Sequence, residues 1–97
     1  MTIDEIRDLV LEGRYNYSQK IRESIEDGWY GEEDLEQCIL TGCISKTERD
    51  ELKTSVDGKK HVILGRDTCG CPFYTCGKAI KDEEGKLYFF ITGHKTK

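Results

Sequence analysis

The spacing of apolar residues changes near Cys43, and this change constrains the fold more than any other feature of the chain. Before Cys43, apolar residues recur every three or four positions, as on one face of an α-helix. After it, they alternate with polar residues or form short runs, as in β-strands. The sequence therefore predicts a helical half followed by a strand half, which is typical of an α+β domain.

Three helices are expected in the first half, near residues 2–12, 18–28 and 31–41. Thr2 and Glu5 have the spacing of a capping box, and Ser18 is a suitable N-cap for the second helix. The third helix opens with three acidic residues from Glu32, which suit the positive end of a helix dipole. Trp29 and Tyr30, in the turn before it, are expected to close the edge of the core.

The second half is expected to form three or four antiparallel strands. Cys43 to Lys46 is a short candidate, His61 to Arg66 is a second, and Phe73 to Lys81 pairs with Lys86 to His94 across a turn at residues 82–85. Residues 47–60 fit either a helical turn or a loop. We therefore expect one domain over residues 1–97, with three N-terminal helices packed on one face of a three- to four-stranded antiparallel sheet.

The same pattern predicts which strand residues face the helices. The expected core consists of Ile6, Leu9, Ile21, Ile25, Leu35, Ile39, Val62, Leu64, Leu87, Phe89 and Ile91. In the hairpin, Tyr74, Cys76, Lys78 and Ile80 would share a face with Leu87, Phe89 and Ile91. Phe73, Thr75, Gly77 and Ala79 would lie on the other face with Tyr88, Phe90, Thr92 and His94. A register shift of one residue would exchange these partners.

Charge is distributed unevenly along the chain. Residues 1–50 hold six Lys and Arg against thirteen Asp and Glu, whereas residues 51–97 hold nine against six. An anionic ligand is therefore expected to bind the C-terminal half, although an acidic surface also serves solubility alone. No apolar run is long enough to cross a bilayer, and the acidic start predicts a cytoplasmic protein without a signal peptide or a membrane partner.

Cys69, Cys71 and Cys76 lie within eight residues and could bind a metal, form a disulfide or remain free thiols. Five cysteines is an odd number, which disfavours a disulfide framework. A closed zinc site needs four ligands, and the fourth would have to come from His61, His94, Cys38 or Cys43. We therefore expect no tightly bound metal and no cofactor, with Cys69 and Cys71 near a turn and Cys76 in a strand. Cys38 and Cys43 are expected to be buried.

A catalytic cluster is predicted on or beside the C-terminal sheet. Metal-independent RNA cleavage needs a base for the 2′-hydroxyl proton, a cation for the phosphorane and an acid for the leaving oxygen. The candidate catalytic residues are His94, Lys78, Tyr74 and Tyr88, and the candidate phosphate-binding residues are Arg66 and Lys95. The alternative is that the tyrosines are ordinary strand residues and that His94 is solvated.

Several stretches resemble a widespread family of small prokaryotic domains of unassigned function. They are residues 13–18, Glu32 to Ile44, Val62 to Arg66, Pro72 to Lys78 and Leu87 to Thr92, so the resemblance covers about residues 3–95. That family is usually placed near the RelE, MqsR and BrnT toxins. The resemblance implies a RelE-like fold and an mRNA endoribonuclease toxin that pairs with an antitoxin protein.

The chain departs from the family pattern at two helical positions, where Lys20 and Ser24 replace a histidine and an arginine. One alternative is therefore a non-catalytic protein-interaction domain of the same fold. Another is a small metal-binding domain built on Cys69, Cys71 and Cys76. The sequence does not predict the oligomeric state.

Overall fold

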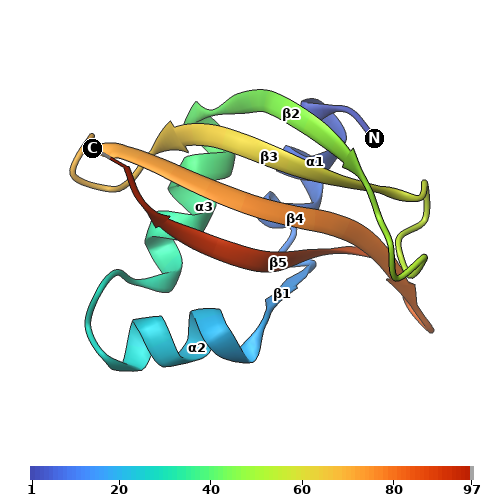
Figure 1. Ribbon diagram of the computed structural model, residues 1–97, viewed down its shortest axis with the longest axis horizontal. Helices are drawn as coiled ribbons and strands as arrows, with labels where there is room; N and C mark the ends of the chain where they lie inside the picture. The colour runs from blue at the N-terminus through green and yellow to red at the C-terminus, as the bar shows by residue number, and fades with distance from the viewer. Residues whose placement is uncertain (97) are drawn as a thin grey trace.

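The computed structural model describes residues 1–96, which form three helices and five strands (Figure 1). In chain order these are α1 (Ile3–Leu11), β1 (Tyr15–Tyr17), α2 (Gln19–Glu26), α3 (Glu32–Thr41), β2 (Cys43–Arg49), β3 (Lys59–Arg66), β4 (Pro72–Asp82) and β5 (Gly85–Lys95). The helices begin and end within two residues of the expected ranges. The Thr2–Glu5 capping box is present, and the Ser18 hydroxyl accepts a hydrogen bond from the Ile21 N–H.

The strands form one mixed sheet in the order β1-β5-β4-β3-β2. Strands β2 to β5 are antiparallel to their neighbours, but β1 runs parallel to β5. The prediction of a three- to four-stranded antiparallel sheet was therefore wrong. It missed β1, because three residues are too few to show an alternation of apolar and polar positions. The Tyr88 N–H donates to the Arg14 carbonyl and the Ser18 N–H donates to the Phe90 carbonyl, which fixes β1 against β5.

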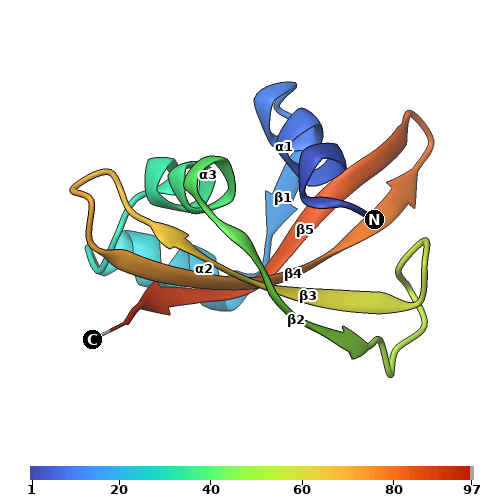
Figure 2. The same cartoon turned by 90° about the horizontal axis from the view of Figure 1, so that it is seen from above.

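The helices are not all on one face. Helices α1 and α3 cover one face of the sheet, whereas α2 lies beside β5 (Figures 1 and 2). The chain enters α2 directly from β1, the outermost strand on that side, and this connection places α2 at the edge. The ambiguous segment 47–60 divides into the end of β2, a loop over residues 50–58 and the first two residues of β3.

The core lies between the sheet and helices α1 and α3. It contains Ile6, Val10, Ile21, Tyr30, Leu35, Cys38, Ile39, Ile63, Phe73, Tyr88 and Phe90. The helical part of the expected core is confirmed for Ile6, Ile21, Leu35 and Ile39, and Leu9 and Ile25 pack against it. In the strands, Leu87 is buried as predicted, but the rest of the expected core is shifted by one residue, because Ile63 and Phe90 are fully buried while Leu64 is 45% exposed. Short apolar runs such as Val62-Ile63-Leu64 do not show which of their members faces inward.

A β-bulge changes the predicted faces of the hairpin. The register shifts between Cys76 and Gly77, so that Cys76 lies opposite Thr92 and Tyr74 lies opposite His94. Residues directly opposite one another in an antiparallel pair share a face, so the predicted pairing of Thr92 and His94 with Phe73 and Thr75 was wrong. No helix within residues 1–96 is long and apolar enough to cross a membrane.

Candidate functional site

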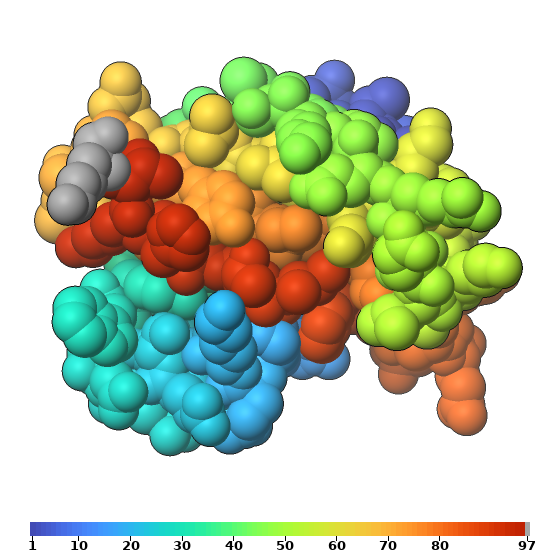
Figure 3. Space-filling view, viewed as in Figure 1, coloured from blue at the N-terminus to red at the C-terminus, as the bar shows by residue number. Residues whose placement is uncertain are grey.

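The face of the sheet opposite α1 and α3 carries no helix, and we call it the open face. Figure 3 looks onto it, with β2 to β5 running from green to red. The register places Val62, Cys76 and Thr92 in one row across the strands, and Leu64, Tyr74 and His94 in the next. The open face also carries Lys46, Glu48, Lys60, Arg66 and Phe89.

Two of the predicted catalytic residues, Tyr74 and His94, lie together on this face. Their ring centroids are 4.2 Å apart, with the ring planes tilted by 56°. The Tyr74 hydroxyl is 3.4 Å from the Thr92 hydroxyl, and His94 Nδ1 is 3.2 Å from the Lys95 carbonyl oxygen. The imidazole is exposed, so a bound ligand can reach it.

The open face carries more positive than negative charge around this aromatic pair. Lys46, Lys60 and Arg66 contribute three cations, while Glu48 contributes one carboxylate, 4.0 Å from the Lys46 ammonium. Arg66 lies at the end of β3, where its Nη1 donates to the Gly70 carbonyl at 2.8 Å. The strand alternation therefore gathers cations that are far apart in the sequence onto one surface.

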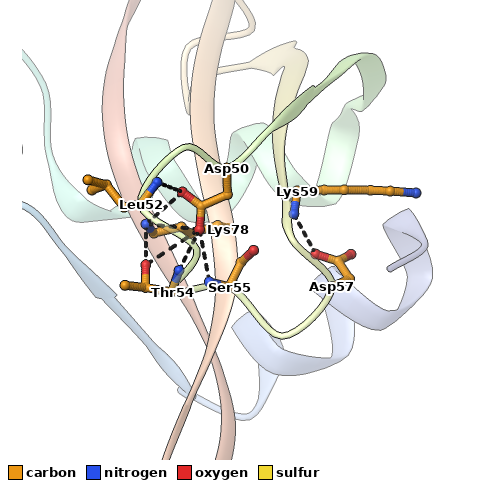
Figure 4. A network of polar contacts seen from close by, with 7 residues as sticks. All are labelled: Asp50, Leu52, Thr54, Ser55, Asp57, Lys59 and Lys78. Atoms are coloured by element: carbon orange, nitrogen blue, oxygen red, sulfur yellow. Dashed lines mark hydrogen bonds and ion pairs between the residues drawn. The ribbon is translucent and has the colours of Figure 1, made fainter.

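Lys78, a third predicted catalytic residue, is buried in a separate polar network (Figure 4). Its ammonium lies 3.3 Å from an Asp50 carboxylate oxygen and 2.5 Å from the Thr54 hydroxyl. Asp50 also accepts hydrogen bonds from the backbone N–H groups of Leu52, Thr54 and Ser55. Lys78 thus holds the 50–58 loop against the sheet.

The same contacts set the ionisation of Asp50. Burial opposes the charged carboxylate, but the N–H groups of Ser55 and Thr54, together with Lys78, outweigh it and lower the pKa of Asp50 to about 2. The carboxylate is therefore charged at neutral pH and is the partner of the Lys78 ammonium.

Tyr88, the fourth predicted catalytic residue, lies on the opposite face of the sheet beneath the helices. It is fully buried, its ring packs edge-on against Phe90, and its hydroxyl has no hydrogen-bond partner within the described chain. Burial raises the pKa of this hydroxyl well above its ordinary value. The structure therefore brings Tyr74 and His94 together, covers Lys78 with the 50–58 loop on the same side of the sheet, and places Tyr88 on the opposite side.

The two predicted phosphate-binding residues are also separated. Arg66 is on the open face, whereas Lys95 lies opposite Phe73 in the register and points with it to the other side of the sheet. The Lys95 ammonium is 3.9 Å from the Asp67 carboxylate, and its side chain is about half exposed.

The cysteines occupy four different environments. Cys69 and Cys71 are exposed in the turn between β3 and β4, where the Asp67 carboxylate accepts from both backbone N–H groups. Cys76 lies within β4, so the predicted placement of these three residues is confirmed. Cys38 is buried as expected, but Cys43 is exposed because it begins the outermost strand.

The three clustered cysteines do not converge. Within residues 1–96, no group of three or more His, Cys, Asp or Glu side chains is arranged to hold a metal ion. Of the suggested fourth ligands, His61 is buried on the helix-covered face, where its Nδ1 contacts the Thr47 hydroxyl at 3.3 Å.

Sequence reasoning missed a pocket at the end of β5. Its volume is about 430 Å³, and it is lined by Ser24, Trp29, Tyr30, Gly93, His94 and Lys95. Tyr30 closes the core as predicted, but Trp29 is 71% exposed. The available signal was the pair itself, because two adjacent aromatic residues in a turn cannot both point into the same core.

Comparison of the chain with protein-family models, with curated proteins and with solved structures finds no match.

Proposed function

We propose that this protein binds single-stranded RNA on the open face. The observation that carries the proposal is the Tyr74–His94 ring pair on a helix-free sheet face that also bears Lys46, Lys60 and Arg66. Aromatic rings on an exposed sheet stack with unpaired bases, and surface cations contact the phosphates. Both kinds of group are needed, and the open face carries both.

RNA cleavage is the second candidate function, and the exposed His94 imidazole favours it. In the proposed step, His94 removes the 2′-hydroxyl proton and the 2′-oxygen attacks the adjacent phosphorus. Arg66 stabilises the negative charge on the phosphorane, the 5′-oxygen leaves as it takes up a proton from water, and His94 releases its proton to solvent. The products are a 2′,3′-cyclic phosphate and a 5′-hydroxyl. An antitoxin protein, the partner implied by the family resemblance, stays a prediction.

Titration of a labelled eight-nucleotide RNA tests binding. The Tyr74→Ala variant should bind about tenfold more weakly, because stacking of one base on an aromatic ring contributes roughly 1–3 kcal/mol. Leu11→Ala is the matched control, since Leu11 is 68% exposed on α1 and lies away from the open face. Equal affinities for wild type and Tyr74→Ala would contradict the proposal.

Cleavage is tested with the same RNA and with a copy that has 2′-deoxyribose throughout. Wild-type protein should cut only the RNA and leave 2′,3′-cyclic ends, and His94→Gln should bind the RNA but leave it intact. Cleavage of the deoxy copy, or full activity of His94→Gln, would exclude this mechanism.

A further inference from the structure

The outer edge of β5 is paired along only part of its length. Strand β1 lies opposite Tyr88–Phe90, and the Ser18 hydroxyl donates to the Ile91 carbonyl. Beyond that point, no described strand pairs with this edge. The Thr96 N–H donates to the Pro72 carbonyl of β4. Because the backbone groups of successive strand residues point to alternate sides, those of Gly93 and Lys95 point away from β4, toward the unpaired edge.

The 430 Å³ pocket lies at this unpaired edge, because Gly93, His94 and Lys95 form one of its walls. Ser24, Trp29 and Tyr30, from α2 and the turn after it, form the opposite wall. The volume is within the range of ligand-binding pockets in proteins and is large enough for a bulky side chain.

One polar group in the pocket has no partner. Tyr30 is 9% exposed, and its hydroxyl forms no hydrogen bond within the described chain. Burial raises the pKa of Tyr30, so the phenol is protonated at neutral pH and can donate. A buried donor without an acceptor is costly, and a ligand that supplies an acceptor removes that cost.

We propose that an extended peptide segment of a partner protein binds here as an added strand, continuing the line of β1 along β5. Its backbone pairs with Gly93 and Lys95, and one large apolar side chain enters the pocket between Trp29 and Tyr30. This is strand addition, in which backbone hydrogen bonds supply affinity and pockets for alternate side chains supply specificity.

The charges beside the pocket favour an acidic residue in the same peptide. The Lys95 side chain is 56% exposed, and its 3.9 Å contact with Asp67 is long for an ion pair. Side chains two positions apart in a strand lie on one face, so an acidic residue two positions from the apolar one would approach Lys95.

Selection from a phage-displayed library of random nonapeptides supplies the probe. Peptides that bind the wild-type protein should share a large apolar residue with an acidic residue two positions away. Trp29 is the only tryptophan of the chain, so its emission should shift to shorter wavelength when a selected peptide covers it. Trp29→Ala should bind the peptide at least tenfold more weakly, while Leu11→Ala, which changes another exposed apolar residue, should bind normally.

Alternate N-methylation distinguishes strand addition from simple occupation of the pocket. Methylating the N–H groups that face β5 should reduce the affinity about tenfold or more, because each leaves a carbonyl of β5 unpaired. Methylating the intervening N–H groups should have little effect. Equal effects of the two sets, or failure of the library to yield peptides that depend on Trp29, would overturn the proposal.

The peptide site and the RNA site are separable by variant. Tyr74→Ala should weaken RNA binding and leave peptide binding unchanged, and Trp29→Ala should do the reverse. If Trp29→Ala instead lost affinity for RNA and no peptide was selected, the pocket would be part of the RNA site and the peptide assignment would be wrong.

Discussion

At position 77 the ring of Tyr88 leaves room for glycine only. A Cβ atom at this position would lie 2.6 Å from three atoms of the Tyr88 side chain, well inside contact distance. Tyr88 is fully buried and cannot move aside freely. Gly77→Ala is therefore expected to lower the free energy of unfolding by about 1–3 kcal/mol, the usual cost of overpacking a core. Urea denaturation followed by circular dichroism measures this change.

Cys76→Ala is the matched control for Gly77→Ala, because Cys76 is the preceding residue and its side chain points to the open face. It should change stability much less. If Gly77→Ala unfolded at the same urea concentration as wild type, Tyr88 would have to be mobile in the folded protein.

The Asp50–Lys78 network predicts a pH dependence. The pKa of Asp50 is lowered to about 2 from 3.8, so its contribution to stability is complete above pH 4. As pH falls from about 4 towards 2, the Asp50 carboxyl binds a proton more readily in the unfolded chain than in the folded protein, so that stability is lost. Asp50→Asn should therefore be less stable than wild type at pH 7, and the difference in melting temperature should shrink towards pH 2.

Thermal unfolding of both proteins between pH 2 and pH 7 measures this. Glu51→Gln is a suitable control, since Glu51 is the next acidic residue of the same loop and its side chain is exposed. A constant difference between wild type and Asp50→Asn across this range would show that Asp50 is not ionised in the folded protein.

At the scale of elements, α1 stabilises the C-terminal end of α3 through one arginine. Arg7 Nη2 donates to the Gly42 carbonyl at 2.7 Å, and Nε donates to the Ile39 carbonyl at 3.2 Å. The last turn of α3 has no basic residue of its own, so Arg7 supplies the positive charge that a helix C-terminus favours. Arg7→Ala should lower the free energy of unfolding by about 1–3 kcal/mol, as expected for hydrogen bonds from a charged donor.

Chemical denaturation measures the effect of Arg7→Ala, and Lys20→Ala is the control, because Lys20 is an exposed residue of α2. A loss no larger than that of Lys20→Ala would mean that solvent caps α3 equally well.

The elements that could be predicted from the sequence are those with local signals. The helices were placed correctly because Thr2, Glu5 and Ser18 act within their own first turns. The hairpin of β4 and β5 was also expected, because its turn residues are adjacent. Strand β1 was missed because it depends on pairing with β5, more than 70 residues away, and its own three residues are too few to establish a pattern.

The candidate site could be predicted only in part for the same reason. His94 and Tyr74 meet because of a bulge between Cys76 and Gly77, which the sequence does not indicate. Lys78 was expected to act in catalysis, but its burial depends on Asp50, which comes from a loop whose conformation was ambiguous. A surface assembled from separate strands requires the register, and the register is a property of the whole sheet.

At the scale of the whole molecule, the net charge of −4 repels RNA, whereas the proposed RNA site requires positive charge. The open face resolves this, because it concentrates Lys46, Lys60 and Arg66 on one side of the sheet. If each cation contacts one phosphate, three counterions are displaced, and log K should fall with log salt concentration with a slope of about −2. Replacing one of them, as in Lys60→Gln, should reduce the slope by about 0.7.

Titration of the eight-nucleotide RNA at several salt concentrations measures both slopes. Lys53→Gln is the control, because Lys53 is exposed in the 50–58 loop and is not among the open-face strand residues; it should leave the slope unchanged. A slope near zero for wild type would show that the open face does not contact phosphates. Equal slopes for wild type and Lys60→Gln would show that Lys60 contacts no phosphate. RNA binding to the variant would then release as many counterions as binding to the wild type, and the phosphate contacts would lie elsewhere.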